Sequence, residues 1–246
     1  FRFLWDGAPG LCLAAAGRCQ SLELSGPRRF ELAQRFASLT LGRLREDPAN
    51  PASARPRVLL AFGFFDAPLQ SCPDGVPGVQ AVLPRWQLSR HGQHCWLRLQ
   101  ATLGAANTPR ALAEELWETA ALLERTALSG SGVQQGQTAT VTWRSPWQRH
   151  YSTVVERGLE LVESGDLSKL VLAVRQQLRC DRTLDPLELL PALRRQQAGS
   201  CRLLWQRGPG AALVGASPER LLTVRQGQLR SDALAGTAAA GADAQA

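Results

Sequence analysis

The sequence predicts an α+β protein with a buried core. The chain has 246 residues, 44% of them hydrophobic, which is enough apolar material for one large or two ordinary domains. Several stretches repeat apolar residues with the period of a helix, whereas many short apolar runs have the length of a strand and are joined by glycine turns. Short strands in series beside separate helices are typical of the α+β class.

In the first half of the chain, turn residues bound the expected strands and helices. Apolar runs of strand length cover residues 1–5, 11–16, 58–65, 79–88 and 94–103. The last two flank Arg90-His91-Gly92-Gln93, which is typical of a hairpin turn. Gly26-Pro27 begins a helical pattern that continues to residue 39, and Thr108-Pro109 begins one that continues to residue 128.

A polar, glycine-rich stretch at residues 129–137 separates this half from the rest. It predicts a boundary between an N-terminal region, residues 1–137, and a second region, residues 138–246. In the second region, Ser145-Pro146-Trp147-Gln148 has the form of a capping box and predicts a helix that ends at Gly165.

Alternating apolar residues follow that helix and predict a buried strand over residues 168–178, with Lys169 and Val171 on one face. Asp185-Pro186-Leu187-Glu188 is a second capping box, for a helix that continues to about residue 197. The remaining strand-length runs cover residues 201–206, 211–215, 221–224 and 228–233.

Among the 28 basic residues, Lys169 is the only lysine. Arginine stays protonated in proteins, whereas burial can drive a lysine amine toward its neutral form, in which it acts as a base or nucleophile. A position that keeps lysine against such a bias is a candidate for chemistry that needs an amine. Chance survival of one surface lysine explains the count equally well.

The formal net charge of +7 suits an anionic small molecule, an acidic surface or nucleic acid. The basic residues are scattered rather than interleaved with aromatic residues, so a solvated surface is favoured over a nucleic-acid interface. No apolar run approaches the roughly 18 residues of a membrane span. Six cysteines without a C-x-x-C pair favour free thiols in the cytoplasm. His91, His94 and Cys95 could be metal ligands, but a hairpin turn explains them more simply.

Four segments in the second half carry a family signature. They are Gly165-Asp166-Leu167-Ser168-Lys169, Val171-Leu172-Ala173, Ser217-Pro218-Glu219-Arg220 and Leu234-Ala235-Gly236-Thr237. In this order, with Lys169 and Glu219 fifty positions apart, they resemble the chorismate-utilising enzyme family and, within it, the isochorismate synthase branch. The resemblance is sharp over residues 146–237. The N-terminal half resembles the variable region that these enzymes place before the chorismate-binding part.

The resemblance implies mixed or antiparallel sheets with helices packed outside, as in anthranilate and aminodeoxychorismate synthases. It also implies isomerisation of chorismate, in which water adds to one ring carbon while a hydroxyl leaves from another. Lys169 matches the family's general base and Glu219 its general acid, so a partly neutral lysine and a protonated glutamate in an apolar setting are expected. The residues implied to bind substrate are Ser217, Ala235, Gly236 and Thr237.

Ala235 implies the branch within the family. Members that attack the ring with their own amine carry lysine here, whereas alanine leaves room for a free nucleophile. Water is the expected one, which gives isochorismate for menaquinone, phylloquinone or siderophore biosynthesis. The alternatives are anthranilate synthase component I, salicylate synthase and, outside enzymes, a basic binding domain. Val174 stands where the family commonly has arginine, and Arg175 follows it, so no role is carried over to Arg175.

The resemblance further implies a requirement for Mg²⁺, with glutamate ligands in a C-terminal half that we expect to be missing, so no metal ligand is assigned in this chain. Chorismate is the expected partner of a cytoplasmic monomer, without nucleic acid or membrane. The chain alone is expected to be inactive and its fold incomplete at the C-terminus. We expect Lys169 and Glu219 to face one cavity about the size of a small ring.

Overall fold

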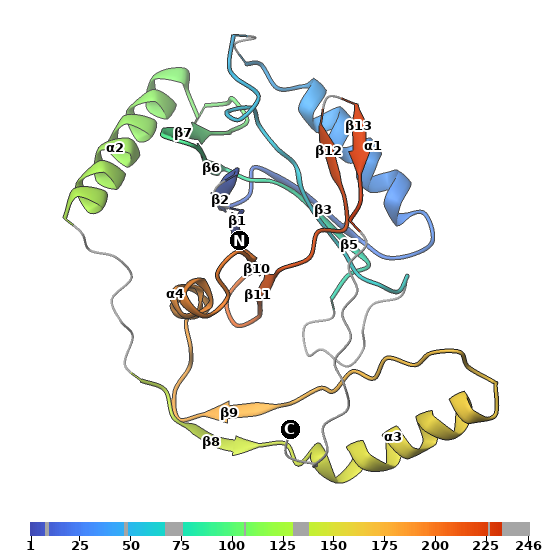
Figure 1. Cartoon of the computed structure of the whole chain (residues 1–246). Coiled ribbons are helices and arrows are strands. Elements are labelled where there is room, and N and C mark those ends of the chain that lie inside the picture. Colours follow the sequence, from blue (N-terminus) through green and yellow to red (C-terminus); the bar gives the residue numbers. More distant parts are fainter. Residues whose placement is uncertain are drawn as a thin grey trace. The chain divides into compact units, whose positions relative to one another are not determined.

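The computed structural model describes residues 1–7, 10–46, 49–66, 76–105, 107–129, 138–225 and 227–232. Its elements are labelled in Figure 1. The chain divides into unit 1, Phe1–Gly132 with Leu189–Ala246, and unit 2, Val133–Glu188. The predicted α+β class is confirmed, because helices accompany antiparallel strands. The predicted second region is shared between the two units, and its assignment to a catalytic domain stays a prediction.

Unit 1 is built on a six-stranded sheet in the order β11-β10-β1-β2-β6-β7. Its strands are β1 (Arg2–Asp6), β2 (Cys12–Ala16), β6 (Trp86–His91), β7 (His94–Leu99), β10 (Cys201–Gln206) and β11 (Ala212–Ser217). Every pair is antiparallel, and β10 lies against β1 with Asp6 opposite Arg202. The first strand of the chain therefore holds the strand pair β10–β11 that leads to Glu219.

A second sheet in unit 1 has the order β3-β5-β4 and comprises β3 (Gln20–Leu24), β5 (Val79–Leu83) and β4 (Leu59–Phe62). All of β5 is buried, because it is the central strand and α1 (Arg29–Gly42) packs on it. The core cluster of Leu13, Ala15 and Leu59 joins the two sheets, since the first two residues belong to β2 and the third to β4.

Two further helices begin where the sequence predicts. α2 (Pro109–Leu128) is capped by Thr108, whose Oγ1 accepts a hydrogen bond from the Ala111 N–H at 3.3 Å, and it packs on β7. α4 (Pro186–Gln196) follows Asp185, whose Oδ1 accepts from the Leu187 N–H at 3.0 Å. Within the described ranges, no helix combines the length and apolar character needed to cross a bilayer.

Unit 2 consists of α3 (Gln148–Glu163) and the antiparallel pair β8 (Val141–Arg144) and β9 (Leu178–Cys180). Among its residues whose side chains the structure describes, Gly158 alone is buried. A set of elements with so little buried surface cannot supply its own hydrophobic core.

Two predictions about this region are wrong. The predicted strand over 168–178 is reduced to β9, which begins at Leu178. The predicted capping box at Ser145 is also absent, because α3 begins at Gln148 without a side-chain cap. The Ser145 hydroxyl instead accepts a hydrogen bond from the Gln177 N–H at 2.9 Å. Ser145 thus joins two strands rather than starting a helix.

The predicted hairpin around Gly92 is confirmed as the β6–β7 pair, with His91 opposite His94. Residues 79–88 are not one strand, because the chain passes from one sheet to the other at Pro84 and Arg85. The last predicted strands are shorter than expected and form the hairpin of β12 (Thr223–Arg225) and β13 (Gln228–Arg230).

Candidate functional site

Lys169 follows the turn that ends α3. Gly165 has a φ of +80°, which favours glycine, and its N–H donates to the Val162 carbonyl at 3.2 Å. The Leu167 N–H donates to the Leu161 carbonyl at 2.9 Å. These bonds close the helix and reverse the chain, so Lys169 lies on a segment that runs back along the helix (Figure 1).

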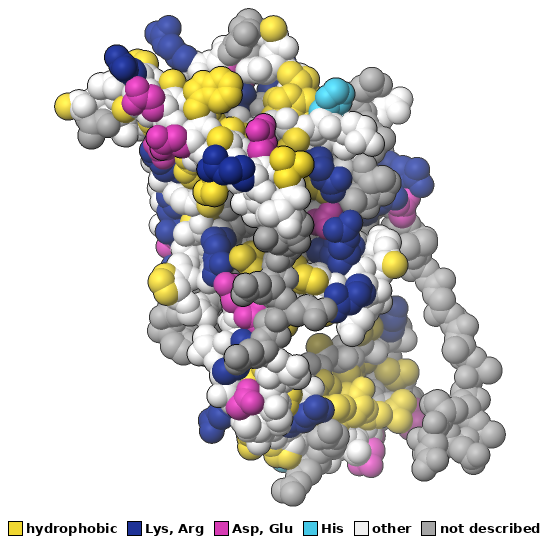
Figure 2. Space-filling model, turned by 90° about the vertical axis from the view of Figure 1, so that its left-hand side faces the viewer, with side chains coloured by type: hydrophobic (Ala, Val, Ile, Leu, Met, Phe, Trp, Pro, Cys, Tyr) yellow, Lys and Arg dark blue, Asp and Glu magenta, His cyan; other side chains and the backbone are white. Residues whose placement is uncertain are grey.

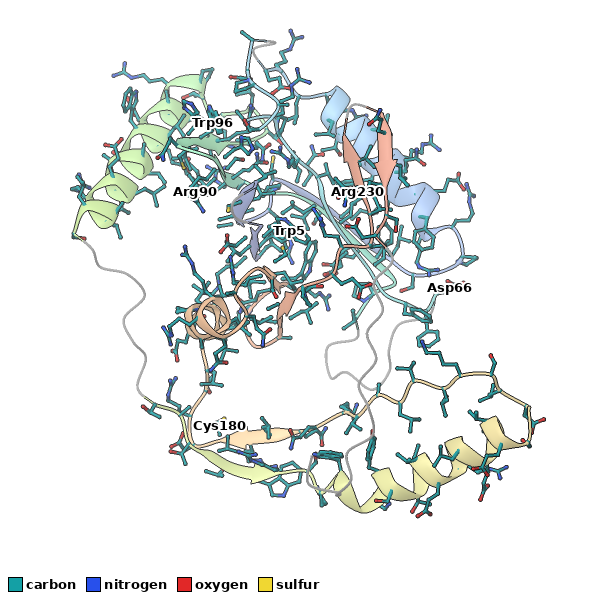
Figure 3. All side chains as sticks on the ribbon, viewed as in Figure 1. Trp5, Asp66, Arg90, Trp96, Cys180 and Arg230 are labelled. Atoms are coloured by element: carbon teal, nitrogen blue, oxygen red, sulfur yellow. The ribbon has the colours of Figure 1, made fainter. Side chains whose placement is uncertain are left out.

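This returning segment, residues 168–177, is exposed except for the half-buried Leu172. Val171, for example, is 77% exposed. The segment carries side chains on both of its sides (Figure 3), as an extended chain does, but no neighbouring strand pairs with it in the described part of the chain. The expected burial of Lys169 is therefore wrong for this structure, because burial on a strand face requires a sheet around the strand.

Glu219 lies in the loop that follows the edge strand β11. The Ser217 hydroxyl donates to the Glu219 carbonyl at 3.1 Å, which tightens the loop. Beyond it, Arg220 contacts Asp232 at 3.3 Å, and Asp232 also pairs with Arg230 of β13, labelled in Figure 3. The Glu219 side chain is exposed rather than set among apolar groups, so that expectation is also wrong here.

The predicted catalytic pair is distributed over both units. Lys169 belongs to unit 2, whereas Ser217 and Glu219 belong to unit 1. Ala235, Gly236 and Thr237 lie outside the described residues. The approach of Lys169 and Glu219 across one cavity therefore stays a prediction.

Unit 1 contains an open cavity of about 830 Å³ that the sequence analysis missed. Apolar side chains of β1, β2, β4 and β10 line it, including Trp5, labelled in Figure 3, and Leu13. Its polar side chains are Gln80 and Arg207, which share Glu23 as a partner at 3.0 Å each. Neither Lys169 nor Glu219 lines this cavity, and its described lining residues include no His, Asp, Glu or Lys that could act as a general base.

A row of charged side chains crosses the six-stranded sheet beside Cys12 and runs from the buried Arg202 to the exposed Arg90. Asp6 accepts hydrogen bonds from Arg202 Nε at 3.0 Å and from the Cys12 thiol at 3.1 Å. Arg90 donates to Cys12 Sγ at 3.2 Å. Burial, reinforced by Asp6, raises the pKa of the Cys12 thiol, so this cysteine stays protonated and serves as a structural donor.

The basic residues do not gather on the face seen in Figure 2, where Lys and Arg side chains are dispersed. The described residues also contain no cluster of three or more His, Cys, Asp or Glu side chains that could hold a metal. Mg²⁺ prefers several carboxylate oxygens, and this part of the chain does not bring such a set together. His94 instead lies beside Trp96, with ring centroids 5.7 Å apart.

Comparison with known proteins gives a match to the family described as "chorismate binding enzyme" over residues 1–246. The chain is 39% identical over 98 residues to a salicylate biosynthesis isochorismate synthase of Pseudomonas aeruginosa, a match that covers 40% of this chain and 20% of that protein. It is 37% identical over 101 residues to isochorismate synthase MenF of Pasteurella multocida, covering 40% and 23%.

Among solved structures, the fold resembles MenF, the menaquinone-specific isochorismate synthase from Escherichia coli. The TM-score is 0.65 at 22% identity, and the match covers 99% of this chain and 50% of that one. The predicted fold, with antiparallel sheets and outer helices, is confirmed by this likeness. The chain spans about half the length of the solved relative, and its matches cover about a fifth of the curated ones.

Proposed function

The chain belongs to the chorismate-binding enzyme family, and on that premise we propose that it is the part of an isochorismate synthase that carries the general base and the general acid. The observation that carries the proposal is the presence of the Lys169 and Glu219 motifs, in family order, in a chain that matches the family throughout. The similarity to isochorismate synthases supports this branch over the others.

In the proposed reaction, Lys169 takes a proton from water while the water oxygen forms a bond to one ring carbon of chorismate. The bond from another ring carbon to its hydroxyl breaks, and Glu219 protonates that oxygen so that it leaves as water. Water is thus consumed and released, and the protons on Lys169 and Glu219 are restored by exchange with solvent. Each transfer is general acid or base catalysis, typically worth about 10²-fold to 10⁴-fold in rate.

This chemistry requires cover over both side chains, because a neutral amine and a protonated carboxyl are favoured by an apolar setting. In the described residues both groups face solvent. We therefore place activity in the whole enzyme, where further polypeptide covers the returning segment and the Glu219 loop. We expect the 246-residue chain alone to be inactive.

Mg²⁺ dependence, a cytoplasmic monomer and a role in quinone or siderophore biosynthesis remain parts of the proposal. No catalytic step is assigned to the metal, since the described residues offer no ligand set for it. Anthranilate and salicylate formation are the alternatives within the family. Alanine at position 235 favours water over an enzyme amine as nucleophile.

The test gives the whole enzyme chorismate, Mg²⁺ and excess ammonium, and identifies the product by mass and absorbance. Isochorismate without nitrogen is expected. Anthranilate would move the protein to the ammonia-using branch, and salicylate would add a cleavage step. An Ala235→Lys variant is expected to lose hydration, because its amine would occupy the site of water. Isochorismate made equally well by that variant would show that position 235 does not border the reacting carbon.

A further inference from the structure

Gly158 occupies an unexpected place for a glycine. It lies inside α3, where glycine is less favourable than alanine because it loses more conformational freedom on folding. Gly158 is also the buried residue of unit 2 noted above. A helix glycine that faced solvent would not be buried. A buried glycine in the interior of a helix indicates that another part of the chain approaches the helix closely at that point.

The group that approaches Gly158 is the side chain of Leu170. A Cβ at position 158 would lie 2.7 Å from Leu170 Cδ2 and 4.0 Å from its Cγ, and apart from the adjacent backbone of α3 no other described atom would lie within 4 Å. Real carbon atoms do not approach so closely without moving. Leu170 can therefore occupy this position only because residue 158 has no side chain.

Leu170 directly follows Lys169 on the returning segment. The Leu167 N–H fixes the segment's start on α3, and Gln177 fixes its end on Ser145. Between these bonds, Leu170 contacts α3 at Gly158. Because neighbouring side chains of an extended chain point to opposite sides, a Leu170 that faces α3 directs Lys169 away from the helix.

We propose that Gly158 is a positioning residue, which seats Leu170 on α3 and thereby sets the direction of the Lys169 amine. The inference rests on the proposed function of Lys169 and adds a determinant of its geometry. In Gly158→Ala the new methyl group displaces Leu170 Cδ2, and we expect the chain at Leu170 to shift with it and to turn the adjacent Lys169 side chain. Misplacement of a reacting group by about 1 Å can cost on the order of 10²-fold in rate.

The chain itself supplies the probe, because Lys169 is its single lysine. Reductive ¹³C-methylation labels this amine and the α-amino group alone, so the Lys169 signal is easily assigned by NMR. Gly158→Ala is expected to shift that signal. Gly42→Ala is the control, since Gly42 is the last residue of α1 and a Cβ there meets nothing within 4 Å. In a Leu170→Ala background, Gly158→Ala is expected to cause no further shift.

If the Lys169 signal of Gly158→Ala coincided with that of the unsubstituted chain, the inference would be overturned. An equal shift in the presence and absence of Leu170 would overturn it too. In the whole enzyme, Gly158→Ala is expected to lower kcat about tenfold to a hundredfold with little change in KM. If Lys169→Gln retained full activity, the proposed base would be wrong, while the NMR result would still decide the role of Gly158.

Discussion

Replacing Asp6 by alanine tests the charged row that joins β1 to β10. Arg202 donates to Asp6 through Nε at 3.0 Å and Nη2 at 2.9 Å, and the two side chains are only 7% and 16% exposed, respectively. Asp6→Ala leaves a buried guanidinium without this partner. Removal of one member of a buried ion pair costs about 3–5 kcal/mol, and we expect about 3 kcal/mol because Asp6 retains some contact with water.

The assay is urea unfolding followed by tryptophan fluorescence. With a slope of about 2 kcal/mol per M, a loss of about 3 kcal/mol lowers the midpoint by about 1.5 M. The control is Glu31→Ala, whose pair with Arg28 at 2.7 Å is more than half exposed on both sides and is therefore expected to change the midpoint far less. The double variant Asp6→Ala/Arg202→Met is expected to regain most of the loss. Equal midpoints for the Asp6 and Glu31 variants would refute the reasoning.

Three further predictions concern single groups. Iodoacetamide is expected to alkylate the exposed Cys95 well before Cys12, whose pKa is raised by burial; mass spectrometry of peptides gives the order, and the reverse order would contradict the packing of β2. Gly165→Ala is expected to cost about 1 kcal/mol in unfolding free energy, because φ is +80° although a Cβ meets no atom within 4 Å; an unchanged urea midpoint would contradict the strain. The hydrogen bond from Arg182 lowers the pKa of Glu188, so the stabilisation by this pair is present at neutral pH and is lost as the pH falls through the lowered pKa. Acid unfolding of Glu188→Gln is expected to lack this loss of stability, and the same acid transition in the variant and the unsubstituted chain would argue against the pair.

The ends of helices could be predicted from the sequence where the residues that determine them are close together in the chain. Thr108-Pro109 marks the start of α2, and Gly165 the end of α3, because capping depends on residues close in sequence. The same reasoning failed at Ser145, whose hydroxyl bonds to Gln177 instead. A side chain with the right spacing for a cap can equally serve a partner that is distant in sequence.

The long-range arrangement could not be predicted in this way. Nothing in residues 201–206 indicates that β10 pairs with β1, although the apolar run correctly marks a strand. Alternation over 168–178 gave a false strand, because alternation defines two faces but strand pairing needs a neighbour. The candidate site shows the same limit, since motifs identify Lys169 and Glu219 while their burial depends on what covers them.

The most direct test of the proposed base is the turnover of Lys169→Arg in the whole enzyme. Arginine keeps the positive charge and most of the length of the side chain but cannot release its proton. We predict that kcat for isochorismate formation falls by about 10²-fold to 10⁴-fold while the Kd for chorismate changes far less. Near-normal turnover by Lys169→Arg would contradict the assignment of Lys169 as the general base.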